Sequence, residues 1–270
     1  MTTILLGLNG ATISNASLEQ ALVVAKQAGF GGFEPRVPSL AEYASANRVK
    51  KVLTTLANLG LVWLPLNALE NVFAWDQATL AAQATAIFSL ALRFQIPYLI
   101  LVPGPAQLSD ALACARLTWL KAQGAQYHVE LLYELIGFRS FAFPNLTQAY
   151  HLANTTGIPL VLDTFHLAIS QTSPKDIMRL SPKAIGLVHL SDAITTGKTL
   201  EELNDIDRVL PGEGGLPLTD LMAAIYQVGY RGPISVEVFH PKYQNEDPYK
   251  VAAEAMSRTK QLLKDAGWPL

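Results

Sequence analysis

The chain is poor in cysteine and in charged residues. It has one cysteine, Cys114, in 270 residues, so no internal disulfide can form, and Lys, Arg, Asp and Glu make up only 16% of the sequence. Cys114 falls in a helical apolar pattern, and we expect it to be packed rather than reactive. The formal charge is −2 and the basic residues form no stripe. These features exclude the electrostatic attraction that nucleic-acid-binding proteins use, so we expect no nucleic-acid partner.

Long uninterrupted apolar runs are also missing. The most apolar stretch, FSLALRFQIPYLILVPG, contains Arg93, Gln95 and Pro97, so we expect no membrane span. The opening residues, MTTILLGLNG, have neither the positive segment nor the small-residue cleavage site of a signal peptide. Together with the single cysteine, this predicts a cytoplasmic protein.

The chain does have short apolar runs that alternate with helical patterns. Half of its residues are hydrophobic. No linker or low-complexity tract divides it. Eight strand–helix units in about 250 residues are typical of a closed (β/α)8 barrel. We therefore predict the α/β class and a single TIM-barrel domain over residues 1–270. The predicted strands are 4–9, 31–34, 61–69, 98–104, 128–134, 158–163, 184–190 and 233–239.

Helix punctuation supports this division. Ser17 and Gln20 form a capping-box pattern before a helix that should end at Gly29, and Asn145 should open a helix that ends at Gly157. An open doubly wound sheet is the alternative fold. Such a sheet usually carries a G-x-G-x-x-G turn after its first strand, and the first turn here is LNGATIS.

Polar residues end or interrupt the last four predicted strands. They are Glu134, Asp163, His189 and Glu237. In a TIM barrel these strand ends converge on one face, where three buried carboxylates would repel one another unless they are compensated. A divalent cation resolves the conflict, and oxygen-rich ligation with one nitrogen suits Mn²⁺, Mg²⁺, Co²⁺ or Zn²⁺. The sequence therefore predicts one divalent metal ion. Glu130 has the same strand parity as Glu134, but it should lie at the opposite rim.

The motifs in this region resemble a known family. YELIGF, LVLDTFH, LVHLSDA, DRVLPGEG and ISVEVFHP are similar to the successive strand-end motifs of the xylose-isomerase-like TIM barrels, the sugar phosphate isomerase/epimerase group. LNGAT, FEPR and LNAL upstream resemble the keto-inositol (inosose) isomerase branch. His240 and Pro35 depart from the usual pattern, and the stretch between strands four and five looks shorter. These departures bear on the substrate more than on the metal.

The resemblance implies roles for individual residues. It implies the same four metal ligands, with Glu134 and Glu237 also exchanging protons with the substrate. It further implies that His166 and Arg208 bind substrate oxygens. Asn9, Asn67 and Arg36, at or just after the ends of predicted strands, are candidates for orienting hydroxyl groups. Phe73 and Trp75 could cover a sugar face or simply pack against the barrel.

The chemistry of these residue types indicates an isomerase. Isomerising a hydroxy-ketone removes a proton next to a carbonyl, and a metal can stabilise the enediolate that results. Two carboxylates can act as base and acid. We therefore predict a divalent-metal-dependent isomerase or epimerase of a keto-polyol or ketose. Its partner would be a small polyol or sugar, and nothing in the sequence excludes a homo-oligomer.

Three other functions stay open. An inosose-dehydratase-type lyase would use the same proton abstraction and then lose water. A metal nuclease like the apurinic endonucleases needs further histidine ligands, and a non-catalytic sugar-binding barrel would leave the ligand set without a role. The histidines available are His128, His151, His166, His189 and His240.

Overall fold

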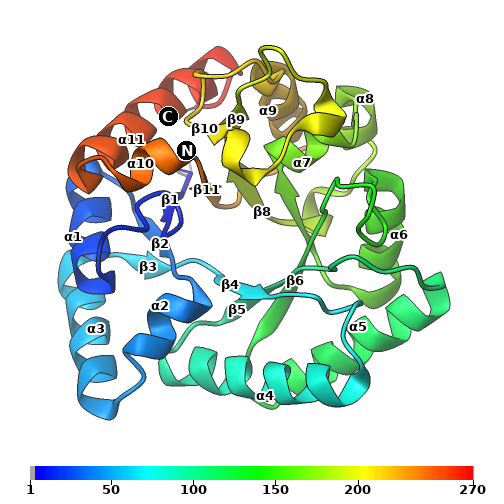
Figure 1. Cartoon of the computed structure of the whole chain (residues 1–270), viewed down its shortest axis with the longest axis horizontal. Helices are drawn as coiled ribbons and strands as arrows, with labels where there is room; N and C mark the ends of the chain where they lie inside the picture. Colours follow the sequence, from blue (N-terminus) through cyan, green and yellow to red (C-terminus); the bar gives the residue numbers. More distant parts are fainter. Residues whose placement is uncertain (1–3, 270) are drawn as a thin grey trace.

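Parallel strands form a nearly closed barrel that helices surround in the computed structural model, which describes residues 4–269 (Figure 1). The predicted single TIM-barrel fold is confirmed, although residues 1–3 and 270 of the predicted domain lie outside the described residues. The sheet order is β3-β2-β1-β11-β8-β7-β6-β5-β4. Its strands are β1 (Leu6–Asn9), β2 (Gly32–Glu34), β3 (Val62–Trp63), β4 (Leu66–Leu69), β5 (Tyr98–Leu101), β6 (Glu130–Glu134), β7 (Leu160–Asp163), β8 (Ile185–Leu190) and β11 (Ile234–Val236).

The third predicted strand, 61–69, is two strands. β3 pairs with β2 and β4 pairs with β5, so the chain crosses from one edge of the sheet to the other within this run. Pro65 lies between them and has no N–H to donate to a strand ladder. A bridge between Arg36 and Asn67, with the Asn67 amide donating to the Pro35 carbonyl at 3.0 Å, joins the two edges. We call this junction the β2–β4 seam.

Helices cover the outside of the barrel, and several begin and end where the sequence predicts. Ser17 accepts a hydrogen bond from the Gln20 amide at the start of α1, which ends at Gly29 with φ 93°. Asn145 caps α6, which ends at Gly157. The last helix, α11, packs against α1 and completes the ring (Figure 1). The α-helices are α1 (Leu18–Ala28), α2 (Val37–Glu42), α3 (Ala46–Leu59), α4 (Gln77–Arg93), α5 (Asp110–Ala125), α6 (Leu146–Thr156), α7 (Thr164–Ile169), α8 (Pro174–Ile177), α9 (Leu218–Gln227), α10 (Pro241–Gln244) and α11 (Pro248–Asp265).

The apolar core has two parts. The larger lies between the strands and the helices, and a smaller cluster takes one residue from each of β4 to β8. In three of these strands the cluster residue lies two positions before a polar strand-end residue, so both side chains point to the barrel interior. The small cluster therefore forms an apolar floor beneath the strand ends. Its members are Ala68, Ile100, Leu132, Val161 and Leu187.

A structured loop follows β8. The short strands β9 (Asp192–Ala193) and β10 (Arg208–Val209) pair antiparallel, which returns Arg208 to the carboxyl end of the barrel. The Asp192 carboxylate accepts hydrogen bonds from the backbone amides of Gly212, Gly214 and Leu216 at 2.9–3.1 Å. These bonds fix the loop that carries Arg208. Within residues 4–269, no helix is both long and apolar enough to cross a membrane.

Candidate active site

The four residues predicted as metal ligands lie together at the carboxyl ends of β6, β7, β8 and β11. They are buried, and one ligand atom from each lies within 4.8 Å of all the others. His189 Nδ1 is 3.2 Å from Glu134 Oε1, 3.3 Å from Glu237 Oε2 and 3.9 Å from an Asp163 carboxylate oxygen. The structure thus brings the whole predicted set into one cluster, which we call the ligand cluster. Among the described residues it is the one group with the composition and spacing to hold a metal ion.

The spacing of these atoms fits a single divalent ion. Oxygen and nitrogen ligands about 2.1 Å from one ion lie about 3.0–3.4 Å from each other in octahedral or tetrahedral arrangements. The two shorter distances from His189 fall in this interval, and the Asp163 oxygen lies slightly outside it. The donor set also fits, because three carboxylate oxygens and one imidazole suit a hard or borderline cation.

Electrostatics in the ligand cluster point the same way. Burial, with further repulsion from Glu134, raises the pKa of Glu237 to about 7 despite the attraction of His189. Burial also raises the pKa of Glu134. Burial alone would lower the pKa of His189, but the charges of Glu237 and Glu34 hold it well above its ordinary value. Protons therefore reduce the negative charge here, and a divalent cation can take their place.

Arg208 reaches the ligand cluster from β10 and is 2% exposed. Its guanidinium donates to a carboxylate oxygen of Asp163 at 2.5 Å and to Asp205 at 2.9 Å, and it lies 4.4 Å from the centre of the Phe165 ring. It also lies 3.0 Å from His166 Nε2. Because a guanidinium only donates, this histidine nitrogen accepts.

His166 is therefore neutral with its proton on Nδ1. Burial first, and then the charge of Arg208, lower the pKa of His166 to about 4. The ring packs edge-on against Phe138 and Phe165. Its Nδ1 is buried and has no hydrogen-bond partner among the described residues. The Asp163 carboxylate accepts from the backbone amides of Phe165 and His166 and so also caps α7.

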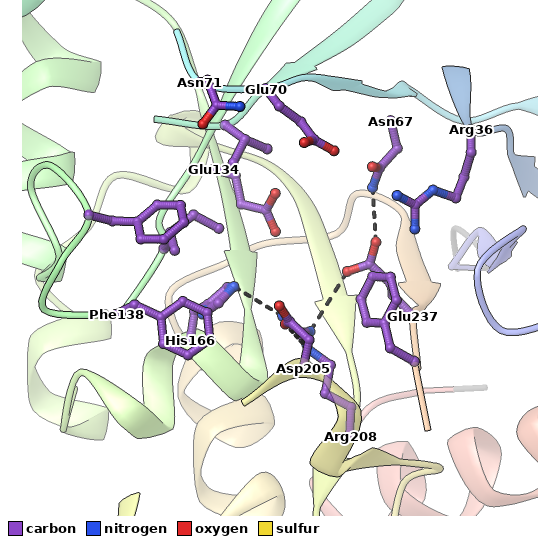
Figure 2. Close-up of a pocket in the computed structure, with 14 residues that line it drawn as sticks. Arg36, Asn67, Glu70, Asn71, Glu134, Phe138, His166, Asp205, Arg208 and Glu237 are labelled. Carbon is purple, nitrogen blue, oxygen red and sulfur yellow. Dashed lines mark hydrogen bonds and ion pairs between the residues drawn. The ribbon is translucent and has the colours of Figure 1, made fainter. Parts of the chain in front are cut away.

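A cavity of about 230 Å³ adjoins the ligand cluster. Figure 2 shows the residues that line it. Of the four cluster residues, only Glu134 and Glu237 line it. The predicted substrate contacts Arg36, Asn67, His166 and Arg208 line it as well, and so do Glu70, Asn71, Asp205 and the rings of Phe138, Phe141 and Phe239, among others. The last six residues were not among the candidates from the sequence.

Two aromatic candidates lie elsewhere. Phe73 is buried against Tyr133 and Phe143, with ring centres 6.0 and 5.7 Å away, and Trp75 is half-buried against the core. Neither lines the cavity. The packing interpretation of these residues therefore agrees with the structure, and Phe138, Phe141 and Phe239 provide the apolar surfaces of the cavity.

The side-chain amides of Asn9 and Asn67 donate hydrogen bonds to buried carboxylates. The Nδ2 group of each donates both to Glu34 Oε1 and to Glu237 Oε1, at 2.7–2.9 Å. Asn67 also lines the cavity, whereas Asn9 is fully buried behind it. Glu34, which the sequence analysis did not select, faces His189 Nε2 at 3.0 and 3.1 Å. It ends β2 just as the four predicted ligands end or follow their strands, so the same signal was present in the sequence.

Arg36 lies next to Asn67, to which the bridge of the β2–β4 seam joins it (Figure 2). Its guanidinium is 5.4 Å from the centre of the Phe239 ring. No ion pair joins it to a carboxylate within residues 4–269. The positive charge that Arg36 brings to the cavity therefore has no carboxylate partner within residues 4–269. The charge of Arg208, by contrast, is paired with Asp163 and Asp205.

The barrel and the ligand cluster at its carboxyl end define a TIM-barrel enzyme with a candidate metal centre. The chain belongs to the xylose isomerase-like TIM barrel family, whose model matches residues 22–261. It is 27% identical to the inosose isomerase of Halalkalibacterium halodurans over 261 residues, which cover 92% of this chain and 90% of that protein. Its relatives include proteins named as isomerases and as epimerases.

Two further similarities concern a dehydratase and a solved structure. The chain is 33% identical to the 3-dehydroshikimate dehydratase of Pseudomonas aeruginosa over 92 residues, which cover 34% of this chain and 14% of that protein. The crystal structure of the IOLI protein with a bound zinc atom matches with a TM-score of 0.89 at 23% identity, covering 96% of this chain and 98% of that one. At this identity the structural match concerns the fold.

Proposed function

We propose that the chain is a divalent-metal-dependent isomerase or epimerase that acts on a keto-polyol or ketose by removing a proton next to the carbonyl. One observation carries the proposal. Within a cluster of four ligand-type residues, Glu134 and Glu237 also line the cavity, so these two carboxylates can reach a substrate as well as an ion. Asp163 and His189 lie beneath them and would serve only as ligands.

The proposed roles of the four residues follow from this division. Glu134, Asp163, His189 and Glu237 would hold the ion, which when bound supplies a Lewis acid that stabilises negative charge on the substrate oxygens. One of the two glutamates takes the proton from a substrate carbon, and the other returns a proton to the neighbouring carbon or to the other face of the same carbon. Because Glu134 and Glu237 come from different strands, each can approach the substrate from its own side.

Substrate contacts are assigned to residues with donors at the cavity wall. Arg208 and Arg36 are proposed to donate to substrate oxygens, and the guanidinium fork suits paired hydroxyl groups. His166 and Asn67 line the same wall. Asn9 is assigned to the support of Glu34 and Glu237, because it is fully buried and both carboxylates accept from its amide group.

The substrate class is inferred from the cavity and the relatives. A cavity of about 230 Å³ suits a small molecule, and the relative that matches over 92% of this chain is named an inosose isomerase. A dehydratase-type lyase is the second candidate, because part of the chain matches a 3-dehydroshikimate dehydratase. A nuclease with several metal ions is not favoured, since His128, His151 and His240 lie outside the cavity and the ligand cluster.

The test is a reaction screen with defined metal content. The protein is stripped of metal, reloaded with Mn²⁺, Co²⁺, Zn²⁺ or Mg²⁺, and incubated in D₂O with keto-inositols and ketoses. Metal-dependent deuterium incorporation with an isomeric product supports the proposal, and loss of water identifies the lyase. A protein that binds no divalent ion, or that converts substrate equally well without one, contradicts the proposal.

A further inference from the structure

Glu34 is a buried carboxylate that the proposed reaction does not use. It is 0% exposed at the end of β2 and does not line the cavity, so it cannot touch a substrate. Its carboxylate nevertheless contacts three side chains near the site. Oε1 accepts from Asn9 at 2.7 Å and Asn67 at 2.9 Å, and both oxygens face His189 Nε2, at 3.0 and 3.1 Å.

These contacts determine which nitrogen of His189 keeps its proton when an ion is bound. An ionised carboxylate only accepts hydrogen bonds, so Nε2 must donate to Glu34. Nδ1 is then the nitrogen on the side of Glu134 and Glu237, at 3.2 and 3.3 Å. A metal-ligating histidine needs its other nitrogen protonated and hydrogen-bonded, because this fixes the ring and strengthens the ligating lone pair.

The same network continues to Glu237. The two amide groups that donate to Glu34 also donate to Glu237 Oε1, each at 2.9 Å. Oε1 is therefore occupied by Asn9 and Asn67, and Oε2 is the oxygen that lies 3.3 Å from His189 Nδ1. Glu34 thus contacts one ligand residue directly and a second through two amides.

We propose that Glu34 is a positioning residue that holds the His189 ring with Nδ1 toward the ion and, through Asn9 and Asn67, turns Glu237 Oε2 into the ligand cluster. This inference rests on the proposed metal function. The plainer alternative is that Glu34 only stabilises the barrel. The two differ in what they predict for the metal and for the protonation of His189.

The first measurement needs no variant. In the zinc-loaded, ¹⁵N-histidine-labelled protein, NMR should find the His189 proton on Nε2, in slow exchange with solvent because the residue is 0% exposed. A His189 proton found on Nδ1 would overturn the inference. A wild-type protein that binds neither Zn²⁺ nor Co²⁺ would instead overturn the proposed function, and this inference with it.

The second measurement is a Co²⁺ titration of the full chain, followed by visible absorption, with the Glu34→Gln variant. Glutamine keeps Oε1 as an acceptor but places an NH2 group where Oε2 faces His189 Nε2, so the network loses the carboxylate charge and one of the two acceptors at that nitrogen. We expect the Kd for Co²⁺ to rise about 10–100-fold, the range for loss of such a partner. Glu34→Asp keeps the charge but withdraws the carboxylate by one methylene, so its Kd for Co²⁺ should lie between those of the wild type and Glu34→Gln. This variant provides the test if Glu34→Gln does not fold.

The matched control is Glu213→Gln. Glu213 is a largely buried carboxylate that pairs with Lys242 and Arg258 and accepts from the Tyr243 hydroxyl, away from the ligand cluster. Its loss should lower the thermal midpoint and leave the Kd for Co²⁺ unchanged. If Glu34→Gln and Glu34→Asp bind Co²⁺ as tightly as the wild type, or if Glu213→Gln weakens binding equally, Glu34 acts only through stability and the inference fails.

Discussion

Replacing Arg208 with lysine separates the role of its guanidinium shape from the role of its charge. In the wild type the group contacts Asp163, Asp205 and the Nε2 of His166 at once, while it is 2% exposed. A lysine ammonium can stay near Asp163, so the buried carboxylate keeps a compensating charge. It cannot also reach both of the other partners, because it is a point charge on a flexible stem.

The contacts set the size of the expected effect. A hydrogen bond to a charged group contributes about 1.5–3 kcal/mol, which applies to the buried contact with His166. The Asp205 side chain is 50% exposed, so its pair with Arg208 adds only about 0–1 kcal/mol. We therefore expect Arg208→Lys to lower the free energy of unfolding by about 1.5–4 kcal/mol. If one lost donor faces the substrate, kcat/KM should fall about 10–100-fold, at about 1.4 kcal/mol per factor of ten.

The assay combines three readings on one preparation. Urea unfolding gives the stability, elemental analysis gives the metal content, and steady-state kinetics with the substrate found in the screen gives kcat/KM. The metal content should equal that of the wild type, since guanidinium is not a ligand. Arg231→Lys is the matched control, because Arg231 is exposed and lies over a Tyr226 ring far from the cavity. Wild-type kcat/KM in Arg208→Lys, or loss of its metal, would refute the assignment.

Three further predictions concern the ligands and the cavity wall. Asp163→Ala should lose the metal by elemental analysis and lower the free energy of unfolding, because the Asp163 carboxylate also caps α7 and pairs with buried Arg208; full metal occupancy would remove Asp163 from the ligand set. Glu237→Gln and Glu134→Gln should retain some metal but lose most turnover, and one of them should still exchange a substrate hydrogen with D₂O; near-normal turnover in both would exclude the two-glutamate mechanism. Gly104→Ala should cost about 1–2 kcal/mol in urea unfolding and raise KM, because Gly104 has φ 77° and a Cβ would lie 2.6 Å from Asn71 Oδ1 at the cavity; wild-type stability would contradict this.

The sequence predicts the barrel well because strand ends and helix caps are local signals. Residues such as Ser17, Gly29 and Asn145 lie where a cap is needed. The division of residues 61–69 into β3 and β4 was missed, since both halves are apolar and only the pairing of each with a different neighbour reveals the break. The position of this break depends on the tertiary arrangement of the strands and not on the local sequence pattern.

The site was predictable in part for the same reason. Glu134, Asp163, His189 and Glu237 each interrupt or end an apolar strand, so their convergence follows from the fold. Which partner a buried amide takes does not follow, because it depends on the register of several strands. The amide of Asn9 therefore meets Glu34 and Glu237, although the sequence analysis assigned it to substrate hydroxyls.

The β2–β4 seam has a consequence for motion. Elsewhere in residues 4–269, neighbouring strands of the barrel are joined by ladders. No ladder joins β2 and β4, which are linked by the isolated bridge between Arg36 and Asn67 and by the hydrogen bond from Asn67 Nδ2 to Glu34 Oε1. Regions with few backbone hydrogen bonds open at low free-energy cost. We therefore expect β2 and β4 to separate before any other pair of neighbouring strands. Both bridging residues line the cavity, so such opening would widen its entrance without unfolding the barrel. The β2–β4 seam, where the barrel lacks a ladder, would then be the route by which substrate enters the cavity.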